Sequence, residues 1–144
     1  MNKETMDMLV EKAMQARTQA YAPYSHFAVG AALLTEDGKC YTGANIENAS
    51  YTPTVCAERV AFFDAIHDGA RKFRAIAIVG GSADAEVNRL CPPCGVCRQV
   101  MSEFCTGEFL VFLFDGKEIQ CYTLDELFPY RFSLSNNKKG EKAL

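Results

Sequence analysis

Three cysteines and one glutamate stand at spacings that suit metal-dependent proton chemistry. Cys56 precedes Glu58 by two positions, and Cys94 and Cys97 follow further along the chain in a Pro-Cys-Gly-Val-Cys stretch. Zinc favours thiolate ligands in tetrahedral geometry, and a catalytic zinc site keeps its fourth position open for water. The pattern therefore favours a zinc ion held by three thiolates, with the carboxylate of Glu58 close enough to share the site.

The elements that carry these residues must bring them to one point. Cys94 and Cys97 are three residues apart, so both can face one ion at the start of a helix. In a regular helix residues two apart point about 200° from each other. Cys56 and Glu58 can therefore share a site only if Cys56 lies at or before the first helical residue, and Pro53 just upstream agrees with a helix that begins there. The positive end of the helix dipole favours a thiolate at such a position.

Two other interpretations of the cysteines stay open at this point. Cys94 and Cys97 alone resemble a thioredoxin-type dithiol, although their proline precedes the pair and Cys56 and Glu58 have no place in that chemistry. A purely structural zinc site would need a fourth ligand, for which Cys91 is the candidate. A fourth thiolate would close the site and abolish water activation.

Charge balance predicts a positive side chain near the sulfurs. Three thiolates exceed the charge of a divalent ion by one, which would make a bound water less acidic. Arg59, with Arg98 as a second candidate, is expected to supply hydrogen bonds and positive charge to the sulfurs. The remaining cysteines are predicted to be small buried apolar groups, and the histidines to be surface or turn residues: Cys40, Cys105 and Cys121; His26 and His67.

Composition narrows the class of protein. A chain of 144 residues with 49% hydrophobic and 23% charged residues is typical of one soluble globular domain. The net charge of −3 gives no electrostatic footprint for a nucleic-acid polymer. The most apolar run, 109–114, is too short to span a bilayer, so no membrane contact is expected. Seven cysteines with no apolar signal segment before them favour a reducing cytoplasm.

Hydrophobic periodicity predicts a sheet between helices. The expected elements are a helix over 3–20, a hairpin of strands 27–34 and 40–46 around an Asp-Gly turn, a helix from 56 to near 69, a strand over 73–80, a helix from 95 or 96 to 104, strands 109–114 and 119–122, and a capped helical turn over 123–127. The helix after Cys56 is expected to bury Val60, Ala61, Phe63, Ala65 and Ile66. The strand 73–80 is apolar on both faces and should be central, with helices on either side.

This order fits a three-layer α/β/α fold with a mixed five-stranded sheet. No internal repeat or second domain is evident. We expect one domain over 1–132 and a polar, loosely ordered tail over 133–144.

From about Tyr21 to Phe132, the chain resembles cytidine deaminases of the small, homotetrameric, zinc-dependent kind. The resemblance is carried by four motifs in order: Tyr21-Ala22-Pro23-Tyr24-Ser25 with Phe27-Ala28-Val29-Gly30-Ala31-Ala32-Leu33, then Asn45-Ile46-Glu47-Asn48-Ala49, then Cys56-Ala57-Glu58-Arg59, and finally Pro93-Cys94-Gly95-Val96-Cys97-Arg98-Gln99. Four motifs in this order are a specific signal.

The resemblance implies a role for each matching residue. Zinc would be bound by Cys56, Cys94 and Cys97, and Glu58 would shuttle protons. The substrate would be held by Asn45 and Glu47 at the ribose hydroxyls, by Phe27 against the pyrimidine, and by the backbone N–H of Ala57 near the pyrimidine carbonyl oxygen. Tyr51 and Phe132 would reach into a neighbouring subunit's site, which makes the tetramer a set of composite sites.

The implied reaction is hydrolytic deamination of cytidine and deoxycytidine to uridine and deoxyuridine, for pyrimidine salvage. An alternative is a deaminase of a related aminopyrimidine nucleoside such as blasticidin S. The Asn45 and Glu47 pair together with Phe27 favours a plain nucleoside. A non-catalytic zinc or dithiol module is the third interpretation.

Overall fold

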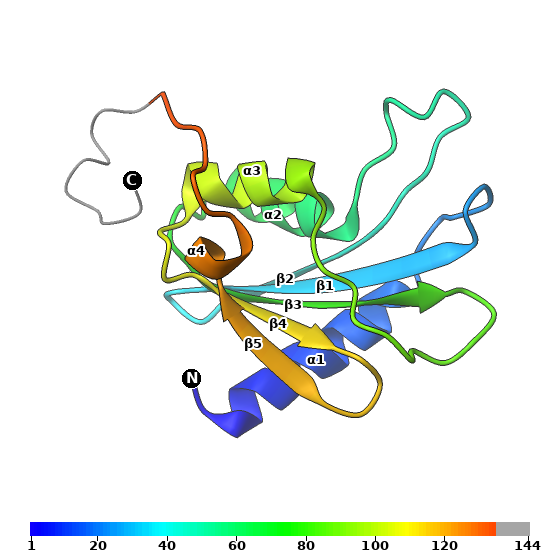
Figure 1. Cartoon of the computed structure of the whole chain (residues 1–144), viewed down its shortest axis with the longest axis horizontal. Helices are drawn as coiled ribbons and strands as arrows, with labels where there is room; N and C mark the ends of the chain where they lie inside the picture. Colours follow the sequence, from blue (N-terminus) through cyan, green and yellow to red (C-terminus); the bar gives the residue numbers. More distant parts are fainter. Residues whose placement is uncertain (135–144) are drawn as a thin grey trace.

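The computed structural model describes residues 1–134 and has strand β3, Phe73–Ser82, in the middle of one sheet (Figure 1). The strand order is β2-β1-β3-β4-β5. Strand β3 pairs antiparallel with β1 and parallel with β4, so the five-stranded sheet is mixed. The other strands are β1 (Phe27–Thr35), β2 (Cys40–Ala44), β4 (Leu110–Phe114) and β5 (Ile119–Thr123). The predicted sheet and its central strand are confirmed.

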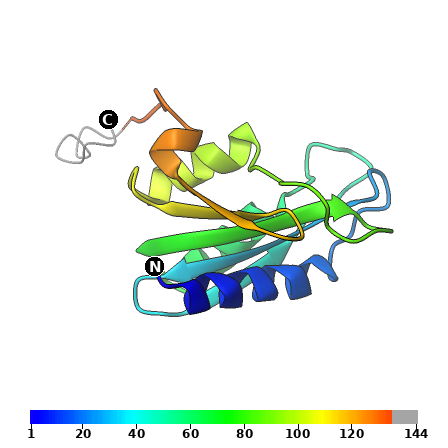
Figure 2. The same ribbon diagram turned by 60° about the horizontal axis from the view of Figure 1, so that its bottom comes forward.

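Helices cover both faces of this sheet, which confirms the three-layer fold. Helix α1 (Lys3–Arg17) lies on one face, and α2 (Ala57–His67) and α3 (Gly95–Phe104) lie on the other (Figures 1 and 2). Side chains of a strand alternate between faces. Ile76 and Ile78 therefore enter the core beneath α2 and α3, whereas Ala77 packs towards α1.

Helix α1 ends before the predicted limit at Ala20. Its start is capped by Asn2, whose Oδ1 accepts a hydrogen bond from the Thr5 N–H at 2.9 Å. Its last helical residue is Arg17, and the hydroxyl of Thr18 donates to the carbonyl of Gln15 at 2.7 Å. That bond satisfies a carbonyl of the final turn, so the chain leaves the helix there.

The buried face of α2 corrects one prediction. Phe63 is 50% exposed, whereas its neighbour Phe62 is fully buried. Adjacent residues of a helix point about 100° apart, so only one of them can face the sheet. Phe62 takes that place, with ring centroids 5.1 Å from Phe73 and 6.0 Å from Phe109.

The cysteines outside the motifs are only partly as predicted. Cys105 is buried and Cys40 is half-buried, but Cys121 is exposed. Cys121 lies on β5, which forms an edge of the sheet, and that position leaves its side chain open to solvent. His26 and His67 are exposed, as expected.

A glycine sets the closest approach between helix α2 and the sheet. A Cβ atom at Gly43, on β2, would lie 2.6 Å from the backbone nitrogen of Ala61 and in still closer contact with the carbonyl oxygen of Ala57. The first turn of α2 therefore rests directly on the strand backbone. This contact fixes how close Cys56 and Glu58 lie to the sheet.

The chain leaves the sheet through helix α4 (Leu124–Leu127). It carries the predicted cap, because the Thr123 side chain accepts from the Glu126 N–H while the Glu126 carboxylate accepts from the Thr123 N–H at 2.7 Å. Most of the predicted polar tail, from residue 135 on, lies outside the described residues. Within residues 1–134, no helix has the length and apolar character needed to cross a membrane.

Candidate active site

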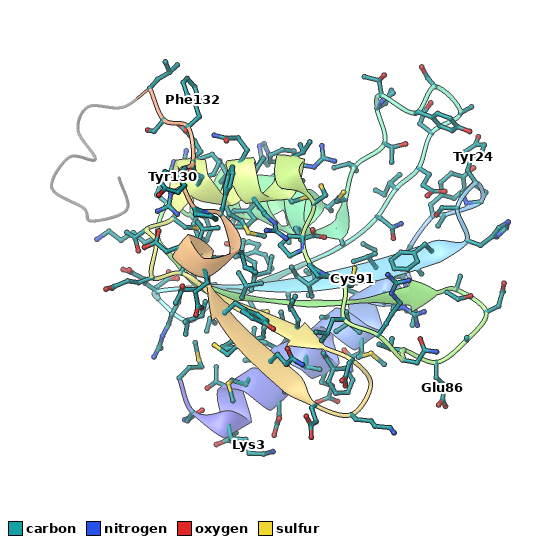
Figure 3. The ribbon with its side chains drawn as sticks, viewed as in Figure 1. Lys3, Tyr24, Glu86, Cys91, Tyr130 and Phe132 are labelled. Carbon is teal, nitrogen blue, oxygen red and sulfur yellow. The ribbon has the colours of Figure 1, made fainter. Side chains whose placement is uncertain are left out.

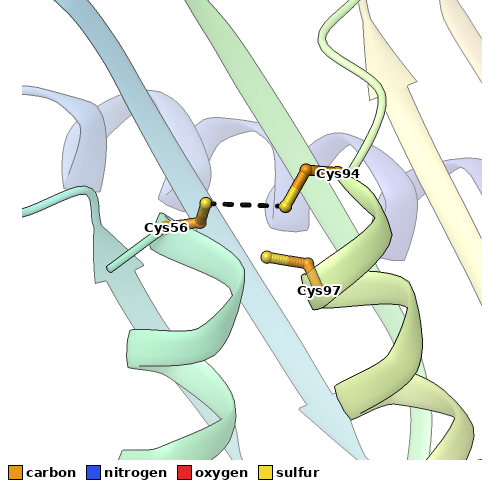
Figure 4. A group of neighbouring side chains, drawn as sticks. All are labelled: Cys56, Cys94 and Cys97. Atoms are coloured by element: carbon orange, nitrogen blue, oxygen red, sulfur yellow. Dashed lines mark hydrogen bonds between the residues drawn. The ribbon is translucent and has the colours of Figure 1, made fainter. Parts of the chain in front are cut away.

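Two helix N-termini meet at the predicted metal site. Cys56 immediately precedes α2 and Cys94 immediately precedes α3, and both have extended backbone with φ of −75° and −68°. Cys97 lies in the first turn of α3 and is buried. Figure 4 shows the three sulfurs pointing toward one another from the two helices.

The spacing of the sulfurs fits one tetrahedral zinc ion. The Sγ atoms of Cys56 and Cys94 are 3.8 Å apart, and the three Sγ atoms lie within 4.8 Å of one another. Zinc–sulfur bonds of about 2.3 Å at tetrahedral angles put two sulfurs about 3.8 Å apart. The donor set and its geometry therefore suit Zn²⁺ before any rearrangement of the protein.

Cys91 does not join this cluster. In residues 1–134 the grouped donor atoms are those of Cys56, Cys94 and Cys97. The Cys91 sulfur packs on β3 instead, because a Cβ atom at Gly80 would lie only 2.6 Å from it. Burial raises the pKa of the Cys91 thiol to about 12. The described residues therefore do not form a closed four-cysteine site. Three thiols at a tetrahedral ion would leave one coordination position for water.

A positive side chain contacts the cluster. The Arg59 Nη2 donates to the Cys56 Sγ at 3.5 Å. The pKa of the Cys56 thiol is lowered, first by a hydrogen bond from Cys97 and then by Arg59. Arg98 is placed differently from expectation: its Nε donates to the Pro93 carbonyl at 2.7 Å, and its Nη1 donates to a carbonyl of α4. Arg98 therefore holds the backbone beside the cysteines and does not reach the sulfurs.

Glu58 is buried beside the cluster. It is the second residue of α2 and is 4% exposed. Cys56 lies outside the helix, so its side chain and that of Glu58 can face the same site, as the helical geometry requires. Burial raises the pKa of the Glu58 carboxyl to about 7. A carboxyl with such a pKa can both accept and release a proton near neutral pH.

Asn45 ties the predicted substrate region to the sheet. It is 8% exposed; its Oδ1 accepts from the Val29 N–H at 2.8 Å and its Nδ2 donates to the Phe27 carbonyl at 2.8 Å. An amide has two lone pairs and two N–H groups. Asn45 therefore retains one acceptor and one donor for a ligand while it fixes the start of β1.

Glu47 lies at a groove of about 310 Å³ with Tyr24, Ser25, Tyr51 and Thr54. Its Oε1 accepts from the N–H groups of Tyr24 and Ser25, each at 3.0 Å. Hydrogen bonding from Ser25 lowers the pKa of the Glu47 carboxyl, so this side chain is ionised and is a strong hydrogen-bond acceptor at the groove. The hydrogen bonds from the backbone to Glu47 were not predicted. The sequence of a turn does not show which of its N–H groups will bind a distant side chain.

The remaining predicted residues lie in different parts of the chain. Phe27 is half-buried against the core beneath α2, and Ala57 is the fully buried first residue of that helix. The ring of Tyr51 stands edge-on to Tyr24 at 6.2 Å in its own chain's groove. Phe132 is 66% exposed and lies across the molecule from Tyr24 (Figure 3). The structure therefore does not bring Phe132 to the groove of its own chain.

Comparison with known proteins agrees with this geometry. Residues 3–113 match the family described as the cytidine and deoxycytidylate deaminase zinc-binding region. Cytidine deaminase of Sporosarcina psychrophila is 49% identical over 129 residues, which are 89% of this chain and 91% of that protein. The crystal structure of cytidine deaminase from Burkholderia pseudomallei superposes with a TM-score of 0.80 at 44% identity, covering 92% of this chain and 100% of that one.

A more distant relative bears on the alternative substrate. Blasticidin-S deaminase of Bacillus cereus is 33% identical over 128 residues, covering 87% of this chain and 90% of that protein. Its identity is well below that of the cytidine deaminases named above. The comparisons thus favour the plain nucleoside.

Proposed function

The chain belongs to the cytidine and deoxycytidylate deaminase family, and from this premise we propose that it converts cytidine and deoxycytidine to uridine and deoxyuridine. The reaction consumes one water molecule and releases ammonia. The observation that carries the proposal is the three-thiol cluster with the buried carboxyl of Glu58 beside it. A structural zinc site has no need of such a carboxyl.

Cys56, Cys94 and Cys97 would hold the zinc ion. When bound, zinc lowers the pKa of water towards neutrality and so supplies a nucleophile at physiological pH. Arg59 offsets the excess negative charge of the thiolates. Arg98 holds the Pro93 carbonyl, which steadies the backbone that leads into the two cysteines of α3.

Glu58 moves the protons. It accepts a proton from water as the water oxygen bonds to the amino-bearing carbon of the ring. It then delivers that proton to the adjacent ring nitrogen. A second proton from the attacking oxygen passes through Glu58 to the amino group, whose bond to carbon breaks as ammonia leaves. The pKa of about 7 suits a group that must accept and release protons in turn.

The groove residues would hold the nucleoside. The ionised carboxylate of Glu47 and the unused donor and acceptor of Asn45 suit the hydroxyls of a sugar. Phe27 offers a flat apolar surface for the pyrimidine. The N–H of Ala57 opens helix α2, where the first N–H groups have no acceptor within the helix, so it suits the pyrimidine carbonyl.

We further propose a homotetramer in the cytoplasm that serves pyrimidine salvage. The proposal is supported by three exposed aromatic side chains that another subunit could cover, one on α2 and two after α4: Phe63, Tyr130 and Phe132. In this assembly Phe132 would complete the site of a neighbouring chain. Tyr51, which lines the groove of its own chain but is 73% exposed, would also reach a neighbouring site. Free thiols at all seven cysteines are typical of a reducing compartment.

The direct test is to incubate the zinc-loaded protein with cytidine, deoxycytidine and blasticidin S in parallel. We expect release of ammonia and loss of the cytosine absorbance with both plain nucleosides, and slow or absent turnover of blasticidin S. The Glu58→Gln protein is the matched control. Preference for blasticidin S would move the assignment to the alternative substrate, and inactivity on all three would refute the enzymatic function.

A further inference from the structure

An arginine from a neighbouring loop lies over the predicted pyrimidine-packing residue. The Cζ atom of Arg89 is 5.6 Å from the centroid of the Phe27 ring. Building on the proposed function, we infer that Arg89 is a positioning residue that orients the Phe27 ring for the pyrimidine and so strengthens nucleoside binding.

The loop that carries Arg89 is anchored on the N-terminal side of that residue. Arg17 spans the start of this loop, since its Nη2 donates to the carbonyls of Ser82 at 2.5 Å and Ala85 at 3.4 Å. Val87 is buried in the core beneath α1, and its carbonyl oxygen would clash with a Cβ atom at Gly116. The backbone therefore approaches Arg89 along a defined path.

The loop is also anchored on the C-terminal side of Arg89. Leu90 and Cys91 pack against the core beneath α2 and α3, and Cys91 is seated on Gly80. Arg89 is thus an exposed residue between two anchored segments. Its backbone cannot move far, so its side chain can hold another group in place at a small cost in entropy.

The backbone of Phe27 is held independently of Arg89. Its N–H donates to the Ser25 hydroxyl at 3.0 Å, and its carbonyl accepts from Asn45 at 2.8 Å. The preceding carbonyl, of His26, accepts from the Ala83 N–H at 2.8 Å, which joins this strand to the loop of Arg89. What these bonds leave free is rotation of the Phe27 side chain.

Arg89 restrains that rotation. A guanidinium over an aromatic face is attracted by the negative potential of the ring. Within residues 1–134 no hydrogen bond or ion pair of the Arg89 guanidinium is seen, and the group that it faces is the Phe27 ring. A ring that is oriented before binding saves the nucleoside the cost of ordering it. Losing this restraint should therefore weaken binding and leave the chemical step unchanged.

The test is a set of steady-state measurements on zinc-loaded protein with cytidine. Arg89→Ala should raise KM about two- to five-fold, the range expected of an exposed cation–aromatic contact, with kcat and zinc content unchanged. Arg89→Lys keeps a cation and should recover part of the loss. Arg74→Ala, which removes an exposed arginine at the far end of β3, is the matched control and should leave KM unchanged.

A double-mutant comparison separates the proposed contact from other roles. In a Phe27→Leu background, Arg89→Ala should add no further rise in KM, because the ring it orients is gone. An equal rise in both backgrounds would overturn the inference, as would an unchanged KM, a fall in kcat or a loss of zinc. If the unaltered protein turns over no nucleoside, the proposed function fails and this inference fails with it. A normal rate that does not respond to Arg89 refutes the inference alone.

Discussion

The guanidinium Nη2 of Arg59 lies 3.5 Å from the sulfur of Cys56, one helical turn earlier in the chain. The Nε of Arg59 is buried and has no hydrogen-bond partner within residues 1–134. A buried donor without a partner is costly. The side chain is therefore held in this place by its attraction to the thiolates, and its role is electrostatic.

Replacing Arg59 should weaken the metal site. We expect Arg59→Ala to lower zinc affinity or slow turnover about ten- to a hundred-fold, the usual effect of removing a group that supports a metal ligand. Competition with a chelator of known affinity measures the first quantity. Arg59→Lys keeps the charge, so its zinc affinity and turnover should lie between those of the unaltered protein and of Arg59→Ala. Equal zinc affinity and turnover in all three proteins would show that the thiolates need no such compensation.

Glu58→Gln should separate metal binding from catalysis. Because the carboxyl moves protons and is not a ligand, the variant should keep its zinc. Its turnover of cytidine should fall by a factor on the order of a hundred to ten thousand, or more because one residue serves several transfers. Metal content per chain and initial rates are the two measurements. A variant that emerges without zinc would identify Glu58 as a ligand.

Cys91 should be dispensable for zinc, in contrast to Cys94. The Cys91 sulfur packs on the sheet at Gly80, outside the three-sulfur cluster. We therefore expect Cys91→Ala to retain both zinc and turnover, whereas Cys94→Ala should lose both. Metal analysis after extensive dialysis decides between them. Loss of zinc from Cys91→Ala alone would revive the closed structural site.

Asn45 and Glu47 should respond differently to substitution. Asn45→Ala leaves the Val29 N–H and the Phe27 carbonyl without partners, which should lower the free energy of unfolding by about 1–3 kcal/mol. Glu47→Gln lies at a groove and should raise KM for cytidine with little change in stability. Denaturant unfolding and steady-state kinetics check the two expectations. An unchanged free energy of unfolding for Asn45→Ala would show that Asn45 has no structural role.

Phe132 should act on a neighbouring chain. We expect Phe132→Ala to keep its zinc but to bind cytidine more weakly or to loosen the oligomer. Mixing Phe132→Ala subunits with inactive Glu58→Gln subunits should raise activity above that of either parent, since some mixed sites combine both intact residues. The mixture must first be shown to exchange subunits. If its activity then equals the sum of the two parents' activities, Phe132 belongs to its own chain's site or to none.

The sequence predicted the elements that have strong local signals. Helix α3 begins at Gly95 as the Pro-Cys-Gly-Val-Cys stretch required, and the cap at Thr123 is formed. The run 73–80 has apolar residues on both faces, which only a central strand of a layered fold can bury. Cys56 stands just outside α2, because sharing a site with Glu58 leaves it no other place.

Tertiary contacts decided what local signals could not. Periodicity does not tell Phe62 from Phe63, since both are large and adjacent; packing against Phe73 selects the first. The exposure of Cys121 depends on β5 being an edge strand. The hydrogen bond from Arg98 to α4 and the contact of Arg89 with the Phe27 ring each join residues far apart in the chain, and no spacing rule predicts them.

The glycine at position 43 has a consequence for how variants of this protein would be interpreted. It carries no chemistry, yet any side chain there would push the first turn of α2 away from the strand, and with it the sulfur of Cys56 and the carboxyl of Glu58. A screen for lost activity would then place Gly43 among the metal ligands, although its contribution is purely one of volume.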